Sequence, residues 1–206
     1  KSDIDLSLRK YFSVNENNLP INEADIVFFL IDLDHFKQVN DLYGHAAGDS
    51  VLINIKEILN EVFRESDYLI RWGGEEFLVV ARFSNRGCAP EIAERLRHLV
   101  ESYNFDIGEG RILRKTCSIG FASFPFIIES PELMSWEQVV DIADHSLYAA
   151  KRSSRNCWVG LENIDCSADN IFDNVTNNTE ELIKSNHLKS INSSKINGKL
   201  KWDNIN

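Results

Sequence analysis

Residues 26–34 read Ile26-Val27-Phe28-Phe29-Leu30-Ile31-Asp32-Leu33-Asp34, an apolar run that stops at two aspartates. β-Branched and aromatic residues dominate the run, and no polar residue alternates with them up to Ile31. Such a pattern is typical of a β-strand that is buried on both faces. The sequence therefore predicts a central strand here, with carboxylates at its carboxyl end.

A second strand-forming region lies between residues 68 and 81. Two apolar runs, residues 68–72 and 77–81, are separated by Gly73-Gly74-Glu75-Glu76. Glycine pairs between strand-like runs mark tight turns, so we expect a hairpin with acidic residues in its turn. If this hairpin lies beside the first strand, Asp32 and Glu75 converge into a set of hard oxygen ligands that suits Mg²⁺. The alternative is a solvated strand end and a glycine turn flanked by surface acids.

The segments around these strands alternate between helical and strand-like patterns. Apolar residues at helical spacing predict a short helical turn with Phe36 and Val39, followed by amphipathic helices at about residues 48–63, 90–103 and 135–151. Residues 112–124 and 157–160 have the composition of further strands. Alternating strands and helices with one hairpin predict an α+β fold, an α/β sandwich, as one domain over residues 1–160.

The composition changes beyond about Leu161. Asparagine becomes frequent, apolar residues become sparse, and no strong periodicity remains. A segment of this kind has too little apolar surface to offset the entropy lost on ordering. We therefore expect residues 161–206 to form a loosely packed polar extension, with a weak helix at residues 179–189.

The charge balance and the hydropathy pattern exclude two classes of partner. With 22 Lys and Arg against 32 Asp and Glu, the net charge is −10. The chain lacks the positive field that gives general affinity for nucleic acids, so we expect no nucleic-acid partner. The longest apolar run, residues 26–31, is far shorter than the roughly 20 residues of a membrane-spanning helix. We expect no membrane segment in this chain.

The cysteines and the first residue bear on the setting of the chain. Cys88, Cys117, Cys157 and Cys166 are widely spaced, with no C-x-x-C pair. Reduced thiols and a cytoplasmic location are therefore expected. The chain starts at Lys1 without a signal peptide. We expect a piece of a longer protein, with an N-terminal regulatory domain outside it that is either membrane-attached or free.

Several long motifs occur together and in order. They are residues 31–41, Gly44-His45, Gly48-Asp49 and Arg71-Trp72-Gly73-Gly74-Glu75-Glu76-Phe77. Over residues 6–160 this set resembles the GGDEF family, the diguanylate cyclases, with the signature turn in its GGEEF form. The resemblance implies condensation of two GTP molecules into cyclic di-GMP and two pyrophosphates by a homodimer. It also implies a fold like that of nucleotide cyclases and polymerase palm domains, with a central, mainly antiparallel sheet wrapped by helices.

The resemblance implies roles in catalysis for particular residues. Asp32, Glu75 and the backbone carbonyl of Leu33 match the family's Mg²⁺ ligands, and Mn²⁺ is an alternative metal. Glu75 or Glu76 matches the group that accepts the proton of the attacking 3′-hydroxyl. Lys37 matches the residue that stabilises phosphate charge, and its alternative reading is an exposed helix lysine.

Other residues match the family's substrate contacts. Asn40 and Asp49 match the readers of guanine, because a carboxylate can accept from N1–H and N2–H₂ while an amide donates to the acceptor edge. On their own, Asn40 reads as a turn residue and Asp49 as the N-cap of the following helix. His45 and Arg71 lie in the same motifs and are expected to contact substrate.

Two further pairs complete the set. Lys151 and Arg155 match the residues that face the β and γ phosphates, although Ser154 stands where the family has a glycine. Arg64 and Asp67 form R-x-x-D at the family's spacing for an inhibitory product site. Their alternative reading is an ion pair at a helix end.

The start of the chain departs from the family. Leu6, Arg9, Lys10 and Phe12 resemble the opening motif, but its Leu-Thr-Gly-Leu core is absent. The leading prediction is an active diguanylate cyclase with product inhibition. The alternative is a catalytically silent domain that binds GTP or cyclic di-GMP and signals to partners. A cyclase that makes adenine-containing dinucleotides is disfavoured by Asp49, whose carboxylate suits the paired donors of guanine.

Overall fold

The computed structural model of this 206-residue chain describes residues 25–165, 171–196 and 198–202. Cys166 and the opening-motif residues Leu6, Arg9, Lys10 and Phe12 lie outside the described residues. The helices and strands are, in chain order, β1 (Asp25–Leu33), α2 (Phe36–Tyr43), α3 (His45–Val62), β2 (Tyr68–Arg71), β3 (Glu76–Ser84), η2 (Arg86–Cys88), α4 (Ala89–Ser102), β4 (Phe105–Asp106), β5 (Ile112–Leu113), β6 (Cys117–Phe124), η3 (Pro131–Leu133), α5 (Trp136–Ser153), β7 (Trp158–Asn163), α6 (Ile171–Asn177), α7 (Thr179–Lys184) and β8 (Leu188–Asn192).

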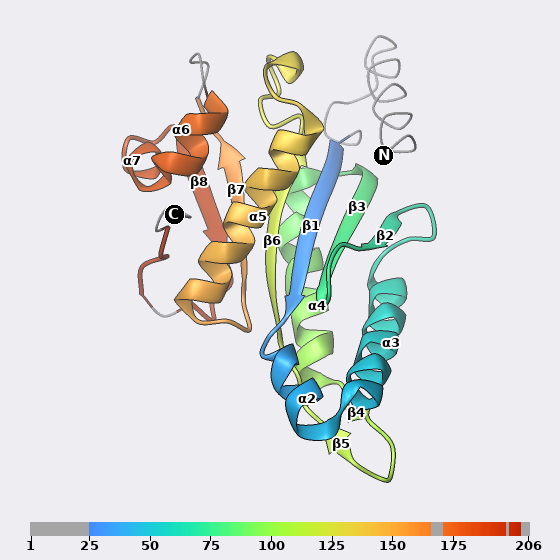
Figure 1. Ribbon diagram of the computed structural model, residues 1–206. Helices are drawn as coiled ribbons and strands as arrows, with labels where there is room; N and C mark the ends of the chain where they lie inside the picture. Colours follow the sequence, from blue (N-terminus) through green and yellow to red (C-terminus); the bar gives the residue numbers. More distant parts are fainter. Residues whose placement is uncertain (1–24, 166–170, 197, 203–206) are drawn as a thin grey trace.

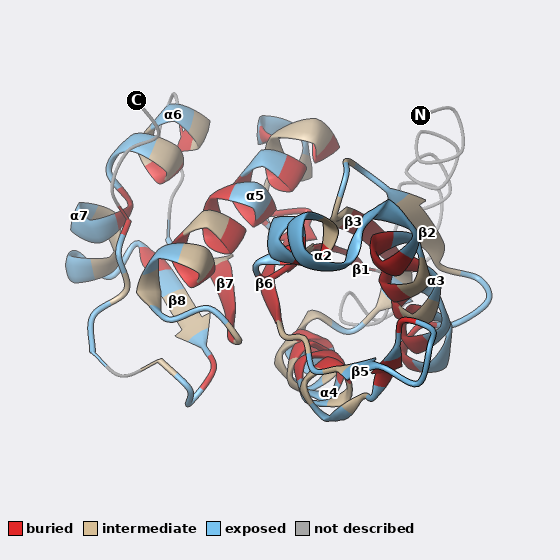
Figure 2. Ribbon diagram, turned by 60° about the horizontal axis from the view of Figure 1, so that its bottom comes forward, coloured by how far each residue is buried: buried red, intermediate tan, exposed pale blue. Residues whose placement is uncertain are grey.

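Strand β1 lies inside a six-stranded sheet whose order is β2-β3-β1-β6-β7-β8 (Figure 1). Its side chains alternate between two buried clusters, as the period of a strand requires. Phe28 and Leu30 pack in the cluster that α5 covers, whereas Val27 and Phe29 pack in the cluster covered by α3 and α4. Figure 2 shows these helices on opposite sides of the sheet. The expected strand, buried on both faces, is confirmed.

The sheet is mixed. The hairpin β2–β3 pairs with β1, β1 pairs with β6, and β7 pairs with β8, all antiparallel. Strands β6 and β7 are parallel because α5 crosses between them. A mixed central sheet flanked by helices confirms the expected α+β, nucleotide-cyclase-like fold.

The structure differs from the sequence prediction of one strand over residues 112–124. Ile112 and Leu113 form β5, which pairs only with β4 in a separate two-stranded sheet. The central strand β6 begins at Cys117, where the burial of consecutive residues begins. Arg114 is exposed between the two strands, because a charged side chain is costly to place inside a sheet that helices cover on both faces.

The segment after Leu161 is also different from its prediction. Its described part forms α6, α7 and β8, and β8 pairs with β7 along five residues. Val175, Leu188 and Trp202 are buried in the cluster that α5 covers. The ring of His145 on α5 stacks on Trp202 with centroids 5.3 Å apart. The sparse apolar residues therefore suffice, because most of those described reach the core of the preceding domain rather than forming a core of their own.

Two expectations about the setting can be compared with the structure. Cys88, Cys117 and Cys157 are free thiols, as expected for reduced cysteines. Among the described residues, no helix has the length and apolar character needed to cross a bilayer.

Candidate active site

Acidic residues gather where β1 and β3 meet the signature turn. Asp32 on β1 lies opposite Glu76 on β3, and the backbone N–H of Leu33 donates to the carbonyl oxygen of Glu75 over 3.4 Å. The hairpin therefore lies beside the first strand, which is the condition that the sequence analysis set for convergence of Asp32 and Glu75. The negative charges of Glu75 and Glu76 both act to raise the pKa of Asp32.

Lys151, near the end of α5, provides the positive charge beside these acids. Its Nζ lies 2.8 Å from Asp32 Oδ2 and 3.3 Å from Glu76 Oε1. Burial raises the pKa of Asp32, against the hydrogen bond and the attraction of Lys151. Burial opposes the charge of Lys151, but its hydrogen bond to Asp32 and the attraction of both acids raise its pKa. The site thus holds partly desolvated carboxylates that are paired with the Lys151 ammonium.

The donor set at this edge is made of hard oxygens. It comprises the carboxylates of Asp32 and Glu75 with the nearby backbone carbonyl of Leu33. Within the described part of the chain, no three His, Cys, Asp or Glu side chains form a ready-made metal cage. Two carboxylates and a carbonyl fit Mg²⁺, which usually keeps several of its positions for water and substrate phosphate.

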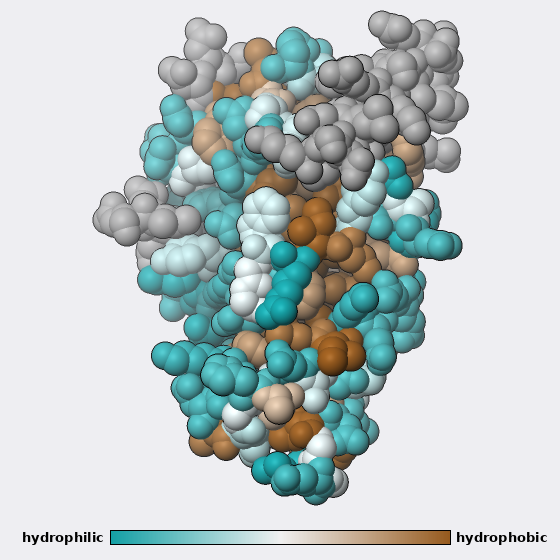
Figure 3. All heavy atoms as spheres, turned by 45° about the vertical axis from the view of Figure 1, so that its right-hand side comes forward, coloured by the Kyte–Doolittle hydropathy of each residue, from teal (hydrophilic) through white to brown (hydrophobic). Residues whose placement is uncertain are grey.

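A pocket of about 510 Å³ opens between α3 and β2. Asp49, Lys56 and Arg71 are its polar lining, while Leu59 and Phe77 are among the residues of its apolar walls. On the face that Figure 3 turns forward, apolar side chains gather between hydrophilic flanks. A pocket with apolar walls and few polar groups is suited to a flat aromatic ligand.

The structure rejects the two alternative readings of the guanine-reading candidates. Helix α3 begins at His45, so Asp49 lies inside the helix and is not an N-cap. Asn40 lies inside α2, not in a turn, although its carbonyl accepts the backbone N–H of Gly44 at 2.9 Å. The amide of Asn40 fills the space above Gly48, where an added Cβ would lie 2.0 Å from Asn40 Oδ1.

The remaining cationic candidates and His45 are on the surface. Lys37, His45 and Arg155 are all exposed. Arg71 donates from Nε and Nη2 to the carbonyl oxygen of Gly74, at 3.1 and 2.8 Å, and so closes the signature turn. Arg71 therefore has a structural contact of its own in addition to lining the pocket.

The fold, the acidic edge and the pocket agree with one family. The sequence model described as "Diguanylate cyclase, GGDEF domain" matches residues 7–157. The chain belongs to the GGDEF family. The match covers the strand end, the signature turn and α5, which are the elements that form the site.

Named relatives of this GGDEF domain are diguanylate cyclases. Diguanylate cyclase A of Treponema denticola is 36% identical over 158 residues, which are 73% of this chain and 41% of the relative. Diguanylate cyclase DgcP of Pseudomonas aeruginosa is 38% identical over 133 residues, which are 65% of this chain and 19% of the relative. The chain thus spans less than half the length of these relatives.

Solved structures show the same GGDEF fold. The crystal structure of the GGDEF domain of DgcB from Caulobacter crescentus, in complex with c-di-GMP, matches with a TM-score of 0.64 and 27% identity, covering 75% of this chain and 81% of that one. The structure of the active GGEEF domain of a diguanylate cyclase from Vibrio cholerae matches with a TM-score of 0.59 and 25% identity, covering 71% and 86%.

Arg64 and Asp67 of this GGDEF domain lie in the connection between α3 and β2. The Asp67 carboxylate accepts the backbone N–H groups of Arg64 at 3.0 Å and of Arg82 at 3.1 Å. No ion pair joins Arg64 to Asp67 in the described structure, so the reading as a helix-end ion pair is wrong. The Arg64 side chain is exposed beside a turn that Asp67 stabilises.

One acidic residue of the GGDEF domain lies near the site and was not predicted from the sequence. Asp144 on α5 lies near Glu76 and Lys151. Burial and then repulsion by Glu76 raise the pKa of Asp144, against the attraction of Lys151. Asp144 and Lys151 are seven residues apart, which is two helical turns and therefore one helix face. That spacing was the signal in the sequence.

Proposed function

We propose that this chain is the catalytic domain of a diguanylate cyclase, which joins two GTP molecules into cyclic di-GMP and releases two pyrophosphates. The convergence of Asp32, Glu75, Glu76 and Lys151 at one edge of the sheet carries this proposal. The active GGEEF domain from Vibrio cholerae supports it, since this chain has the same form of the signature.

Asp32, Glu75 and the carbonyl of Leu33 would hold Mg²⁺, or Mn²⁺, next to the triphosphate. The metal supplies charge neutralisation for the phosphates and the leaving pyrophosphate. Lys37, Lys151 and Arg155 add positive charge around the same phosphates, in keeping with their family positions.

The chemical step proceeds as an in-line displacement. The 3′-oxygen of one nucleotide forms a bond to the α-phosphorus of the other, and the bond from that phosphorus to pyrophosphate breaks. Glu75 or Glu76 takes the hydroxyl proton, since Glu75 ends the turn and Glu76 begins β3, both beside Asp32. The reciprocal step closes the ring.

Guanine would be read at the pocket between α3 and β2. Asp49 lines this pocket and accepts from N1–H and N2–H₂ of the base. Asn40 approaches from α2 across Gly48 and donates to O6. His45 and Arg71 flank the same region and contact the nucleotide. The apolar walls exclude water from the base, which strengthens these hydrogen bonds.

We also propose two features at the level of the assembly. Each chain offers one nucleotide site, so two copies must face each other as a homodimer for the nucleotides to react. Arg64 and Asp67 form a product site that inhibits the enzyme, in keeping with the related GGDEF domain solved in complex with c-di-GMP.

The free thiols agree with a cytoplasmic location, where thiols stay reduced.

The test is incubation with GTP and Mg²⁺, with the product identified by mass. Cyclic di-GMP should form, and removal of the metal with a chelator should stop its formation. Glu75→Ala should abolish turnover, whereas Glu57→Ala, at an exposed acid on α3, should retain it. Parental turnover in a folded Glu75→Ala variant would contradict the proposal. Binding of GTP or cyclic di-GMP without turnover would support the silent signalling module.

A further inference from the structure

The turn that follows α5 has an unusual backbone. Arg155 and Asn156 have φ angles of 55° and 47°, so two consecutive non-glycine residues adopt the left-handed region. This region is unfavourable for residues with a side chain, although asparagine tolerates it better than most. Such a conformation persists only where surrounding contacts hold it.

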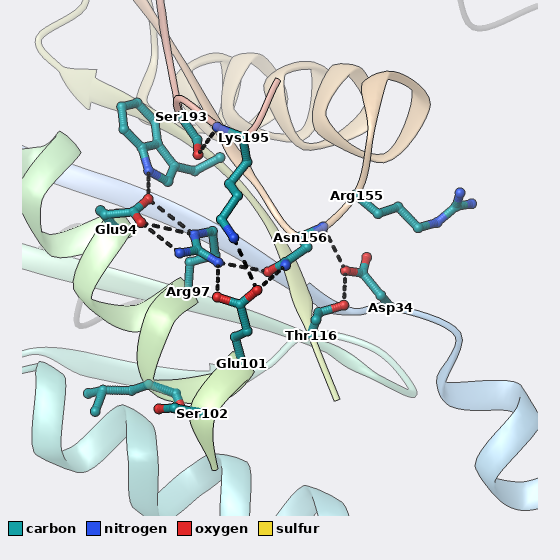
Figure 4. A network of polar contacts seen from close by, with 12 residues as sticks. Asp34, Glu94, Arg97, Glu101, Ser102, Thr116, Arg155, Asn156, Ser193 and Lys195 are labelled. Carbon is teal, nitrogen blue, oxygen red and sulfur yellow. Dashed lines mark hydrogen bonds and ion pairs between the residues drawn. The ribbon is translucent and has the colours of Figure 1, made fainter. Parts of the chain in front are cut away.

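Asn156 is held by three hydrogen bonds to three different partners (Figure 4). Its backbone N–H donates to Asp34 Oδ2 at 2.9 Å. Its side-chain Oδ1 accepts from Arg97 Nη1 at 2.9 Å, and its Nδ2 donates to Glu101 Oε1 at 2.7 Å. The backbone N–H, the side-chain oxygen and the side-chain nitrogen of Asn156 therefore each have a hydrogen-bond partner.

The partners of Asn156 are themselves fixed. Asp34 is 2% exposed and also accepts from the hydroxyls of Thr116 and Ser118, both at 2.7 Å. Arg97 is 1% exposed and forms ion pairs with Glu94 at 2.7 Å and Glu101 at 2.8 Å. Asn156 thus joins the residue that follows β1 to α4 through the buried side chains of Asp34 and Arg97 and the partly exposed carboxylate of Glu101.

The residue before Asn156 has the opposite character. Arg155 is exposed, and Figure 4 shows its side chain pointing away from the network. Its guanidinium forms no ion pair within the described residues. Lys151, one helical turn earlier, reaches Asp32. The network therefore fixes the backbone of the turn while leaving the charge of Arg155 available to a ligand.

We propose that Asn156 is a positioning residue that directs Arg155 toward the β and γ phosphates of the nucleotide. This inference rests on the proposed function, because it concerns the phosphate end of the same site. The two hydrogen bonds of the Asn156 side-chain amide, to Arg97 and Glu101, hold the left-handed conformation of Arg155 and Asn156.

The C-terminal segment reaches the same network. Lys195 donates from Nζ to Glu101 Oε1 at 3.2 Å, and it follows β8, outside the region that the family model matches. Its side chain is 46% exposed, so its share in holding the network is small. Lys195→Ala should change nucleotide affinity by less than about twofold.

The test compares two ligands on the purified chain by calorimetry. One is 3′-deoxy-GTP, which lacks the attacking hydroxyl and binds without condensing; the other is GMP, which lacks the β and γ phosphates. Asn156→Gly keeps the backbone N–H and the freedom for positive φ but removes the amide. It should weaken 3′-deoxy-GTP about tenfold and GMP less than twofold. Asn186→Gly, at a residue with φ 62° outside the network, is the matched control and should change neither.

A double-mutant cycle separates positioning from general damage. Arg155→Ala should give the same selective loss, and Asn156→Gly should add nothing to it. Equal losses for both ligands, or an additional loss in the Arg155→Ala background, would overturn the inference. If Asn156→Gly does not fold, Glu101→Gln is tested instead, because it keeps the shape of a side chain that binds Asn156. It should still reduce the difference between the affinities for 3′-deoxy-GTP and GMP. An unchanged difference overturns the inference. Failure of the parent to bind 3′-deoxy-GTP would overturn the proposed function as well.

Discussion

At the scale of single residues, Gly48 on α3 lets the side chain of Asn40 on α2 approach closely, next to Asp49 in the sequence. The amide of Asn40 occupies the space that a side chain at position 48 would need, and Phe36 Cζ lies 3.1 Å from the same point. Glycine is therefore required here by close approach, since the helix φ at this position suits any residue. Gly48 thus leaves room for the Asn40 amide, and the next residue, Asp49, provides a carboxylate at the pocket.

Gly48→Ala should displace the Asn40 amide and reduce the preference for GTP over ATP by about tenfold, as loss of one hydrogen bond to the base would. Folding stability should change little, because the main obstacle to the new methyl group is the far end of a side chain that can rotate. Binding of both nucleotides and thermal unfolding would be measured. Ser50→Ala on the same helix is the control. An unchanged preference would remove Asn40 from base recognition.

Glu101 provides a pH prediction at the same scale. Hydrogen bonds from Arg97 and then Asn156 lower the pKa of its carboxyl from 4.5 to about 2. Because the folded state favours the charged form, this stabilisation is complete above pH 4.5 and is lost as the pH falls toward 2. Glu101→Gln should therefore make the free energy of unfolding fall less steeply over that range. Urea unfolding at a series of pH values measures this, with Glu57→Gln as the control for removing one exposed charge.

Retention of the parental slope in Glu101→Gln would show that the network does not depend on this charge. Some slope should remain in the variant, because the pKa of Glu94 is also lowered, chiefly by its hydrogen bond from Arg97.

At the scale of secondary-structure elements, β8 changes the limits of the domain. It covers the edge of β7, which would otherwise expose unpaired backbone groups. Helices α6 and α7 precede it, and Thr179 at the start of α7 hydrogen-bonds His145 on α5 at 2.8 Å. We infer that these elements unfold together with the sheet.

Leu188→Ala tests this cooperativity. Leu188 is 1% exposed on β8, so its truncation should lower the free energy of unfolding of the whole domain by about 2–5 kcal/mol. Leu42→Ala, at a leucine that is 73% exposed on α2, should change it by less than about 0.5 kcal/mol. Urea unfolding followed by tryptophan fluorescence measures both. A main transition that Leu188→Ala leaves unmoved would mean that the segment opens separately.

At the scale of the whole molecule, the proposed reaction needs two copies. Specific activity should rise with protein concentration, because dimer formation brings the two nucleotides together. Initial rates from nanomolar to high micromolar protein, with the oligomeric state measured in parallel, would show this. Constant specific activity in a sample that stays monomeric would contradict the two-fold arrangement.

Product inhibition is the second prediction at this scale. A guanidinium can donate two hydrogen bonds to the O6 and N7 edge of guanine, and the Arg64 side chain is exposed for such a contact. Arg64→Ala should raise the concentration of cyclic di-GMP needed for half inhibition about tenfold while leaving the uninhibited rate unchanged. Asp67 is unsuitable for this test, because its carboxylate holds two backbone N–H groups. Identical inhibition curves, or full relief by GTP, would refute the site.

Sequence patterns predicted the central strand, a hairpin and the resemblance to the family. An apolar run predicts β1, and a Gly-Gly turn between two apolar runs predicts the hairpin of β2 and β3. The family is indicated by motifs that follow one another in a fixed order along the chain. The convergence of Asp32 and Glu75 was predicted only on the condition that the hairpin lies beside the first strand, and the pairing of β1 with β3 meets this condition.

The roles of residues whose partners are far away in the chain could be assigned from the three-dimensional arrangement alone. Asn156 and Asp34 are 122 positions apart in the chain, and Arg97 and Asn156 are 59 apart, so no local sequence pattern predicts either hydrogen bond. The packing of β8 escaped prediction for the same reason, since its apolar residues bury against β7 and α5. Burial and hydrogen-bond satisfaction are properties of neighbours in space, and a sequence lists only neighbours along the chain.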